Sequence, residues 1–128
     1  MKQFVILIYE DDATYVESLM YSLDGKIKLK GKKLVVHHKE NGDSLDQDLN
    51  VYSPNLIMVD HDLGATTGDD LIQIIDSMPE HNSVSIYYYS GGETLDDLEE
   101  KARRHKCNIR CFTKEGDNLD IAILGLVE

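Results

Sequence analysis

Five short apolar stretches recur along the chain, and each has the length of a β-strand. Residues 4–9 form a continuous apolar run, which is typical of a strand whose two faces are both covered. Further apolar runs occupy residues 56–59 and 84–89, and shorter ones occupy 34–36 and 109–113. The pattern therefore predicts five strands.

The segments between these strands carry apolar residues at helical spacing. Asp12 or Thr14 is the predicted N-cap of the first helix, which ends near Gly25, and residues 26–33 then form a basic loop or extended edge. Pro79 ends the third helix. The five helices, expected to begin near residues 12, 42, 68, 94 and 117, present these apolar residues: Val16, Leu19, Met20 and Leu23; Leu45 and Leu49; Leu71, Ile72, Ile75 and Met78; Leu95, Leu98 and Ala102; and Leu119, Ile121, Ala122, Ile123, Leu124 and Val127.

Strands and helices alternate along the chain, with no internal repeat and no linker rich in proline or serine. This alternation predicts an α/β fold, a doubly wound parallel sheet of five strands with helices on both faces. A length of 128 residues suits one domain, which we expect to span residues 1–128.

Composition narrows the class of function. The net charge of −11 disfavours direct binding to nucleic acid. Two cysteines, Cys107 and Cys111, do not make a disulfide framework. No apolar stretch approaches the roughly 20 residues that span a bilayer, and the first apolar run is too short for a signal peptide. We therefore expect a cytoplasmic protein without a membrane partner.

Polar residues with useful chemistry follow four of the predicted strands. The acidic stretch 10–12 follows the first strand along the chain, Asp60 the third, Ser90 the fourth and Lys114 the fifth. The carboxyl ends of parallel strands meet at one edge of the sheet, where ligands bind. Carboxylates gathered there repel one another unless a cation joins them, which indicates a divalent metal and phosphate chemistry.

Each of these groups has a part in such chemistry. Glu10, Asp11 and Asp60 supply the hard oxygen ligands that Mg²⁺ prefers. The carboxylate of Asp60 can also attack phosphorus and form an aspartyl phosphate. The ammonium of Lys114 and the hydroxyl of Ser90 would then contact the phosphoryl oxygens and neutralise their charge.

In their order and spacing, these motifs resemble the receiver domain of response regulators, the phosphoacceptor module of two-component signalling. The resemblance covers nearly the whole chain: residues 8–12, residues 56–63 with Gly68 shortly after, the strand that ends at Ser90, and residues 113–114. It implies a flavodoxin-like fold with strand order 2-1-3-4-5. It also implies that the chain is not an enzyme, apart from its own phosphorylation and dephosphorylation.

The resemblance implies a magnesium site at the strand ends. Glu10 and Asp11 match the acidic pair that holds Mg²⁺, with Asp11 as a direct ligand and Glu10 acting through water. A register shifted by one residue would make Asp11 and Asp12 the pair. Asp60 is a further ligand, and the backbone carbonyl of Asp62 matches the third protein ligand.

The same resemblance implies a phosphorylation switch. Asp60 matches the phosphoacceptor, Ser90 the hydroxyl that moves toward the phosphoryl group, and Lys114 the lysine that pairs with it. The implied partners are a histidine kinase or phosphotransfer protein as donor and a downstream protein target.

The chain departs from the family pattern in three places. Glu115 follows Lys114 where the family usually has proline, so no cis bond is expected there and the lysine loop differs. Gly64 stands in place of a proline after the acceptor loop. Cys111 occupies the usual position of the aromatic switch residue.

Other readings remain open. Residues 59–64 resemble a divergent receiver-like group proposed to process cyclic phosphates. An acid after the first strand followed by Asp60-x-Asp62 is similar to Mg²⁺-dependent Toprim nucleases and primases, although no glycine follows Glu10 and the net charge repels DNA. Haloacid-dehalogenase-like phosphatases carry Asp-x-Asp after the first strand instead. A degenerate receiver that binds partners without phosphorylation is a further alternative.

Several conspicuous residues receive structural interpretations. His61 is expected to point away from Asp60, and residues 87–89, three tyrosines, are expected to pack in the sheet. The final helix is apolar around most of its circumference, so it is either covered or a contact patch, and we expect a homodimer through it. Four other histidines are expected to be surface or packed residues: His37, His38, His81 and His105. Cys107 and Cys111, with His105 nearby, are not expected to bind zinc, because no second ligand cluster accompanies them.

Overall fold

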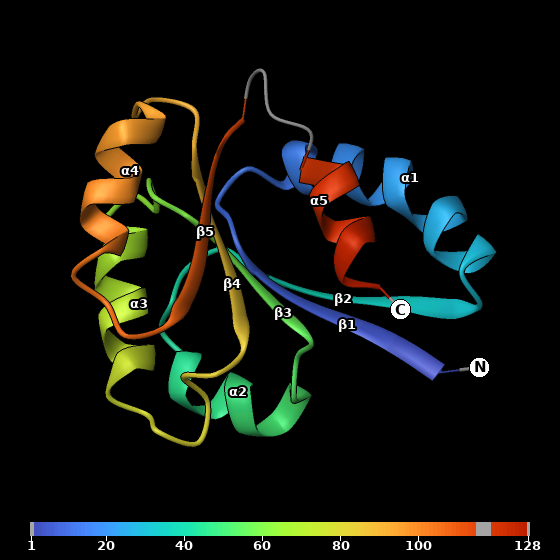
Figure 1. Ribbon diagram of the computed structural model, residues 1–128, viewed down its shortest axis with the longest axis horizontal. Coiled ribbons are helices and arrows are strands. Elements are labelled where there is room, and N and C mark those ends of the chain that lie inside the picture. Colours follow the sequence, from blue (N-terminus) through green and yellow to red (C-terminus); the bar gives the residue numbers. More distant parts are fainter. Residues whose placement is uncertain (1, 115–118, 128) are drawn as a thin grey trace.

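The computed structural model of the chain describes residues 2–114 and 119–127. Within that part, five parallel strands form one sheet with the order β2-β1-β3-β4-β5 (Figure 1). The elements in chain order are β1 (Lys2–Tyr9), α1 (Ala13–Leu29), β2 (Lys32–Lys39), α2 (Leu45–Tyr52), β3 (Leu56–Asp60), α3 (Gly68–Asp76), β4 (Ser85–Ser90), α4 (Leu95–Ala102), β5 (Asn108–Thr113) and α5 (Leu119–Leu126). The predicted α/β class and the strand order implied by the family resemblance are both confirmed.

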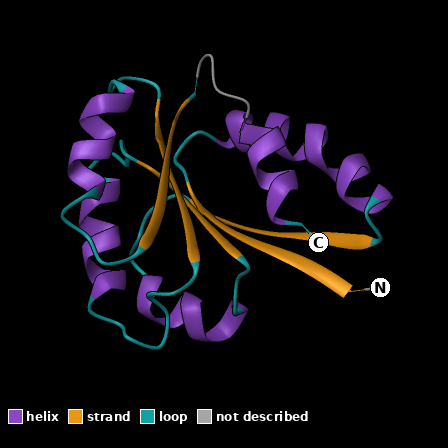
Figure 2. Ribbon diagram, viewed as in Figure 1, coloured by secondary structure: helices purple, strands orange, loops and turns teal. Residues whose placement is uncertain are grey.

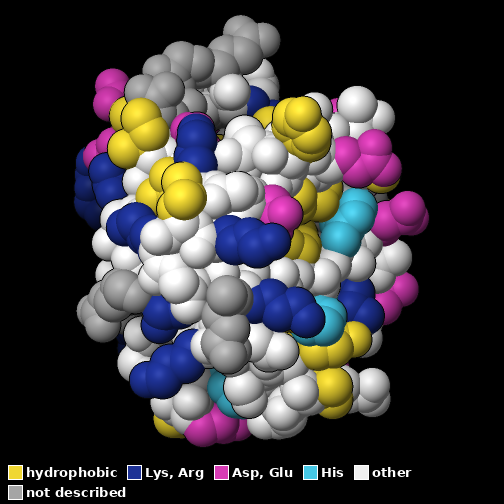
Figure 3. Space-filling model, turned by 90° about the vertical axis from the view of Figure 1, so that its right-hand side faces the viewer, with side chains coloured by type: hydrophobic (Ala, Val, Ile, Leu, Met, Phe, Trp, Pro, Cys, Tyr) yellow, Lys and Arg dark blue, Asp and Glu magenta, His cyan; other side chains and the backbone are white. Residues whose placement is uncertain are grey.

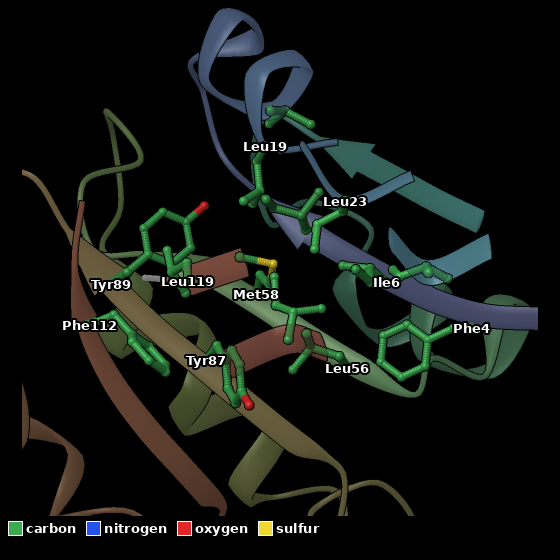
Figure 4. Close-up of a cluster of buried hydrophobic side chains, with 14 of the residues drawn as sticks. Phe4, Ile6, Leu19, Leu23, Leu56, Met58, Tyr87, Tyr89, Phe112 and Leu119 are labelled. Carbon is green, nitrogen blue, oxygen red and sulfur yellow. The ribbon is translucent and has the colours of Figure 1, made fainter. Parts of the chain in front are cut away.

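Helices cover both faces of the sheet, with α1 and α5 on one side and α2, α3 and α4 on the other (Figures 1 and 2). Because side chains alternate along a strand, each strand contributes to two cores. In β1, Ile6 and Ile8 are fully buried beneath α1, whereas Leu7 and Tyr9 are fully buried on the opposite face. Figure 4 shows the core on the α1–α5 side.

The first helix is longer than the sequence predicted. It does not end near Gly25 but continues to Leu29. Ile27 is fully buried in the core, and Lys26 forms an ion pair with Asp120 of α5 at 3.1 Å. These tertiary contacts outweigh the cost of about 1 kcal/mol that a glycine imposes inside a helix.

The second strand is also longer than predicted. The interpretation of residues 26–33 as a loop or extended edge is wrong for residues 26–29, which form the last turn of α1, whereas residues 30–31 form a turn and residues 32–33 are extended. β2 begins at Lys32 and runs well beyond the predicted 34–36. Its pairing with β1 extends from Lys2↔Lys32 to Tyr9↔Lys39, and this ladder stabilises the additional residues.

Three helices that follow the carboxyl ends of strands begin with a side-chain N-cap. Asp12, and not Thr14, is the N-cap of α1. Thr67 forms a capping box with Asp70 at the start of α3, and Thr94 caps α4 as expected. These caps fix where the loops after the strands end.

The last helix is covered on one side only. Leu119 and Ile123 are buried in the core, whereas Ile121 is 61 % exposed. The predicted helix start near Asp117 and the bond between Lys114 and Glu115 lie outside the described residues. The homodimer expected through this helix stays a prediction.

Charge is distributed unevenly over the surface. The face in Figure 3, which is the right-hand side of Figure 1, shows many Lys and Arg side chains, although the net charge is −11. Five lysines lie between residues 26 and 33, where α1 ends and β2 begins. Among the described residues, no helix combines the length and the apolar character that crossing a bilayer requires.

Candidate functional site

The carboxyl ends of β1, β3, β4 and β5 bring the predicted polar residues to one edge of the sheet. Glu10 follows β1, Asp60 ends β3, Ser90 ends β4 and Lys114 follows β5. The alternation along each strand places Glu10, Asp60 and Lys114 on the face that α1 covers, in register with the buried residue two positions before each of them. This geometry brings together residues that are distant in sequence, and we call the cluster of Glu10, Asp60 and Lys114 the carboxylate pocket.

Two carboxylates share one lysine in this pocket. The ammonium nitrogen of Lys114 lies 2.8 Å from Oε1 of Glu10 and 3.4 Å from Oδ2 of Asp60. Glu10 is 0 % exposed and Asp60 is 3 % exposed, so water solvates neither carboxylate well. One ammonium therefore faces two acids, and the pocket has an excess of potential negative charge.

Further donors fix Glu10. The hydroxyl of Tyr89 donates to Oε1 at 3.1 Å, and the amide of Asp12 donates to Oε2 at 3.1 Å. The backbone carbonyl of Glu10 lies 2.6 Å from Nε2 of His38, and its amide donates to the carbonyl of Lys39. Glu10 is thus held at both its side chain and its backbone.

The two acids hold their protons differently. Burial raises the pKa of Asp60 to about 7, and the neighbouring Glu10 adds to the rise. Burial also opposes ionisation of Glu10, but hydrogen bonds with Asp60 and Lys114 hold the pKa of Glu10 below its ordinary value. Near neutral pH, Glu10 is ionised, whereas Asp60 is protonated in a large fraction of the molecules.

The site has the donor set for a hard divalent cation. One carboxylate oxygen from each of Glu10, Asp11 and Asp60 lies within 4.8 Å of the others. Asp11 is exposed, and burial together with Glu10 raises its pKa. Three crowded carboxylates, two of which (Asp11 and Asp60) have raised pKa values, fit a Mg²⁺ ion, because its charge would relieve their repulsion.

Asp11 and Asp12 make different contacts, and which of them belongs to a metal-binding pair stays a prediction. Oδ1 of Asp12 accepts hydrogen bonds from the amides of Thr14 and Tyr15, so this carboxylate caps α1. Asp11 therefore joins Glu10 in the cluster. Asp62 lies beside the pocket, where its amide donates to Oδ1 of Asp60 at 3.4 Å; the metal-binding role of its carbonyl stays a prediction.

Ser90 is buried at the end of β4. Its Oγ accepts hydrogen bonds from the amides of Gly92 and Glu93, each at 3.0 Å, and its carbonyl accepts from the amide of Lys114 at 3.0 Å. The two accepted bonds occupy the lone pairs of Oγ and leave the O–H as a donor. Ser90 thus connects the turn after β4 to the lysine.

His61 faces the opposite side of the sheet from Asp60, as the alternation predicted. Its Nδ1 lies 2.5 Å from the hydroxyl of Tyr88, and its Nε2 lies 3.3 Å from the carboxylate of Glu93. His61 is 7 % exposed and does not contribute to the carboxylate pocket. It connects β3 to the loop that follows β4.

A second polar cluster joins both ends of α3 to the segment before β5. The two ring nitrogens of His105 contact Asp76 at 2.6 Å and Asp69 at 2.7 Å, and the thiol of Cys107 donates to Asp76 at 2.8 Å. Among the described residues, only the group at the strand ends has three potential metal ligands close together. His105 is therefore a packed histidine, as predicted, and Cys107 contacts the same carboxylate of Asp76.

The sequence analysis missed the polar role of the tyrosines. Residues 87–89 were interpreted as sheet packing, and their rings do pack, but each hydroxyl also has a partner: Ala122 for Tyr87, His61 for Tyr88 and Glu10 for Tyr89. The signal was available, because a buried tyrosine hydroxyl requires a hydrogen-bond partner.

Several solved structures with a similar fold are receiver domains. The signal receiver domain of a DNA-binding response regulator from Colwellia psychrerythraea is 23 % identical, with a TM-score of 0.76 over 97 % of this chain and 98 % of that one. A response regulator receiver domain from Methylobacillus flagellatus is 19 % identical, with a TM-score of 0.72 over 100 % of this chain and 99 % of that one.

A third similar structure is the signal receiver domain of a signal transduction histidine kinase from Syntrophus aciditrophicus. It is 20 % identical, with a TM-score of 0.73 over 96 % of this chain and 86 % of that one. No protein-family model and no curated protein matches the sequence. The chain therefore has the fold of response-regulator receiver domains.

Proposed function

We propose that residues 1–128 act as one receiver domain, a phosphoacceptor switch in a two-component relay, with Asp60 as the acceptor. One observation carries the proposal: in this fold, the ammonium of Lys114 lies between Asp60 and Glu10, with Asp11 close by. A nucleophilic carboxylate, a fixed cation and a divalent-cation site are the parts that phosphoryl transfer requires.

The reaction is a displacement at phosphorus. An oxygen of Asp60 forms a new bond to phosphorus, while the bond to the donor breaks and its electron pair leaves with the donor group. In a phosphohistidine that bond is P–N, and in acetyl phosphate it is P–O. The ammonium of Lys114 and the hydroxyl of Ser90 are the groups of this chain that would contact the phosphoryl oxygens.

Glu10, Asp11 and Asp60 would hold Mg²⁺, with the carbonyl of Asp62 as a further ligand. When bound, the ion supplies positive charge to the phosphoryl oxygens. The residues of the chain have separate tasks: Glu10 is held by its hydrogen bonds, Lys114 binds anionic oxygen, and Asp60 must release its proton before it attacks.

The phosphorylated state would signal through protein contacts. A histidine kinase or phosphotransfer protein is the proposed donor, which fits the likeness to a receiver domain of a histidine kinase. A downstream protein or a second copy of this chain is the proposed target. Ser90 would transmit the change, because its Oγ holds the amides of Gly92 and Glu93 ahead of α4.

Intact-mass spectrometry after incubation with acetyl phosphate and MgCl₂ tests the proposal. We expect the wild type to gain the mass of one phosphoryl group, whereas Asp60→Asn and wild type in EDTA remain unmodified. Asp96→Asn, which changes an exposed acid of α4, is the matched control and should label normally. Undiminished labelling of Asp60→Asn would overturn the assignment. Metal-dependent nicking of DNA without labelling would favour the Toprim-like alternative.

A further inference from the structure

Lys114 is enclosed by two aromatic rings as well as by two carboxylates. Its ammonium lies 4.5 Å from the ring centroid of Tyr15 and 5.6 Å from that of Tyr89. Both distances are within the range of about 6 Å at which a cation is attracted to the face of an aromatic ring. The rings of Tyr15 and Tyr89 stack on each other at 5.7 Å with an interplanar angle of 26°.

The fold brings these two rings together from different elements. Tyr15 belongs to the first turn of α1, where its amide donates to the capping carboxylate of Asp12 at 3.2 Å. Tyr89 belongs to β4 on the face that α1 covers, as Figure 4 shows. The cap that starts α1 therefore also places the ring of Tyr15 against Tyr89, beside the ammonium of Lys114.

The two tyrosines act on Lys114 in different ways. Tyr89 is fully buried, and its hydroxyl donates to Glu10, so it also holds a metal-binding carboxylate. Tyr15 is half-buried: its ring stacks on Tyr89, lies beside the ammonium and packs against the edge of the core that α1 covers. Among the described residues, no hydrogen bond joins its hydroxyl to Glu10 or Asp60. Tyr15 can therefore be changed without removing a hydrogen bond from the carboxylates.

We propose that Tyr15 is a positioning residue for phosphoryl transfer, whose ring holds the ammonium of Lys114 in the carboxylate pocket. Lysine has a flexible four-carbon side chain, and its point charge has no preferred direction of its own. Two carboxylates attract it but do not prevent it from moving along the pocket edge. The ring closes one side of the site and restricts the ammonium to positions near Asp60. This role depends on the function proposed above.

The first experiment compares Tyr15→Leu, Tyr15→Phe and the matched control Tyr21→Leu, which changes a tyrosine of the same helix that is 88 % exposed. The maximal labelling rate by acetyl phosphate is measured at saturating MgCl₂. We expect Tyr15→Leu to label about 3- to 10-fold more slowly, because a partly desolvated cation–π contact is lost. Tyr15→Phe keeps the ring face and should stay within about twofold of wild type, as should Tyr21→Leu. The MgCl₂ concentration for half-maximal rate should not change.

Two results of that comparison would overturn the proposal: a wild-type rate in Tyr15→Leu, or a rate in Tyr15→Phe as low as that in Tyr15→Leu. The proposal would also be contradicted if Tyr15→Leu kept the wild-type maximal rate but needed a higher MgCl₂ concentration to reach half of it. In that case the ring would support the metal-binding loop and not the lysine.

The second experiment needs neither metal nor phosphodonor. Ring currents shift the side-chain methylene resonances of Lys114 upfield when an aromatic face lies over them, and ¹³C-resolved NMR detects that shift. We expect the full shift in wild type and Tyr15→Phe and a clearly smaller one in Tyr15→Leu, where only the more distant ring of Tyr89 remains. If the wild type is not labelled at Asp60 but the NMR shift follows this pattern, the proposed phosphoacceptor function is refuted, whereas the proposed position of Lys114 is supported. An unchanged shift in a folded Tyr15→Leu would refute the placement itself.

Discussion

The ammonium of Lys114 lies closer to Glu10 than to Asp60: Nζ is 2.8 Å from Oε1 of Glu10 and 3.4 Å from Oδ2 of Asp60. Glu10 follows β1 and Lys114 follows β5, and β3 and β4 lie between these two strands in the sheet. Their contact closes the pocket across the strands between them. Because Glu10 is 0 % exposed, the lysine is the main source of positive charge for a carboxylate that water cannot reach.

Replacement of Lys114 by methionine should destabilise the protein. The change leaves Glu10 ionised and buried without its cation, and breaking such a pair costs a few kcal/mol. Because Lys114 is 20 % exposed, we expect a loss of about 2 kcal/mol at pH 8, measured by urea denaturation with tyrosine fluorescence. Lys26→Met, which breaks the exposed pair with Asp120, is the control and should cost less than about 1 kcal/mol. Equal losses in both variants would contradict the special role of the buried pair.

Asp60 should make the stability of the protein depend on pH. Its pKa is about 7 in the folded chain, above its ordinary value of 3.8, so the folded state holds the proton more tightly than the unfolded state. The resulting stabilisation is complete below about pH 4 and is lost as the pH rises to about 7.

Asp60→Asn should remove that pH dependence. We expect the variant to be more stable than wild type at pH 8, by about 2 kcal/mol, with a much smaller difference at pH 4. Urea denaturation without divalent metal across this range measures both values. Asp96→Asn, at an exposed position on α4, should not reproduce the effect. A difference between Asp60→Asn and wild type that does not change with pH would refute the assigned pKa.

Local sequence patterns predicted much of the candidate site. Each strand ended close to its polar residue, and parallel pairing was enough to bring Glu10, Asp60, Ser90 and Lys114 to one edge. The alternation of side chains along β3 also predicted correctly that His61 points away from Asp60. These features follow from one short segment at a time, together with one rule about parallel sheets.

Features that depend on contacts between distant segments were not predicted. α1 passes through Gly25 because Ile27 reaches the core and Lys26 reaches α5. The hydroxyl of Tyr89 meets Glu10 because β4 and β1 lie on either side of β3, and no spacing in the sequence records that arrangement. Periodicity specifies which face a residue occupies but not which group it meets there.

Asp76 should stabilise the second polar cluster above acidic pH. Burial opposes its ionisation, but the thiol of Cys107 and the ring of His105 outweigh this effect and hold the pKa of Asp76 below its ordinary value of 3.8. The folded state therefore prefers the ionised form. This stabilisation is present above about pH 4 and is lost as the pH falls further.

Asp76→Asn should lower the free energy of unfolding by about 2 kcal/mol at pH 7, because it removes the charge that receives bonds from His105, Cys107 and the amide of Lys106. Urea denaturation should show a smaller difference at pH 3, where wild type has lost part of the same contribution. Asp24→Asn, at an exposed position of α1, is the control and should have little effect at either pH. A difference that grows on acidification would contradict the direction of the shift.

The contact between His61 and Glu93 should control the mobility of the turn after β4. The carboxylate of Glu93 lies 3.3 Å from Nε2 of His61, while its amide and that of Gly92 donate to Oγ of Ser90. Glu93→Ala removes the connection to β3 but leaves both amides in place. We expect the amide hydrogens of residues 92 and 93 to exchange about tenfold faster, because their opening no longer has to break the contact with His61. Hydrogen-exchange NMR measures the two sites directly.

Glu99→Ala, on the exposed side of α4, is the matched control and should leave both rates unchanged. Unaltered exchange in Glu93→Ala would mean that Ser90 alone holds the turn, and the histidine would then be only a packed residue of the core.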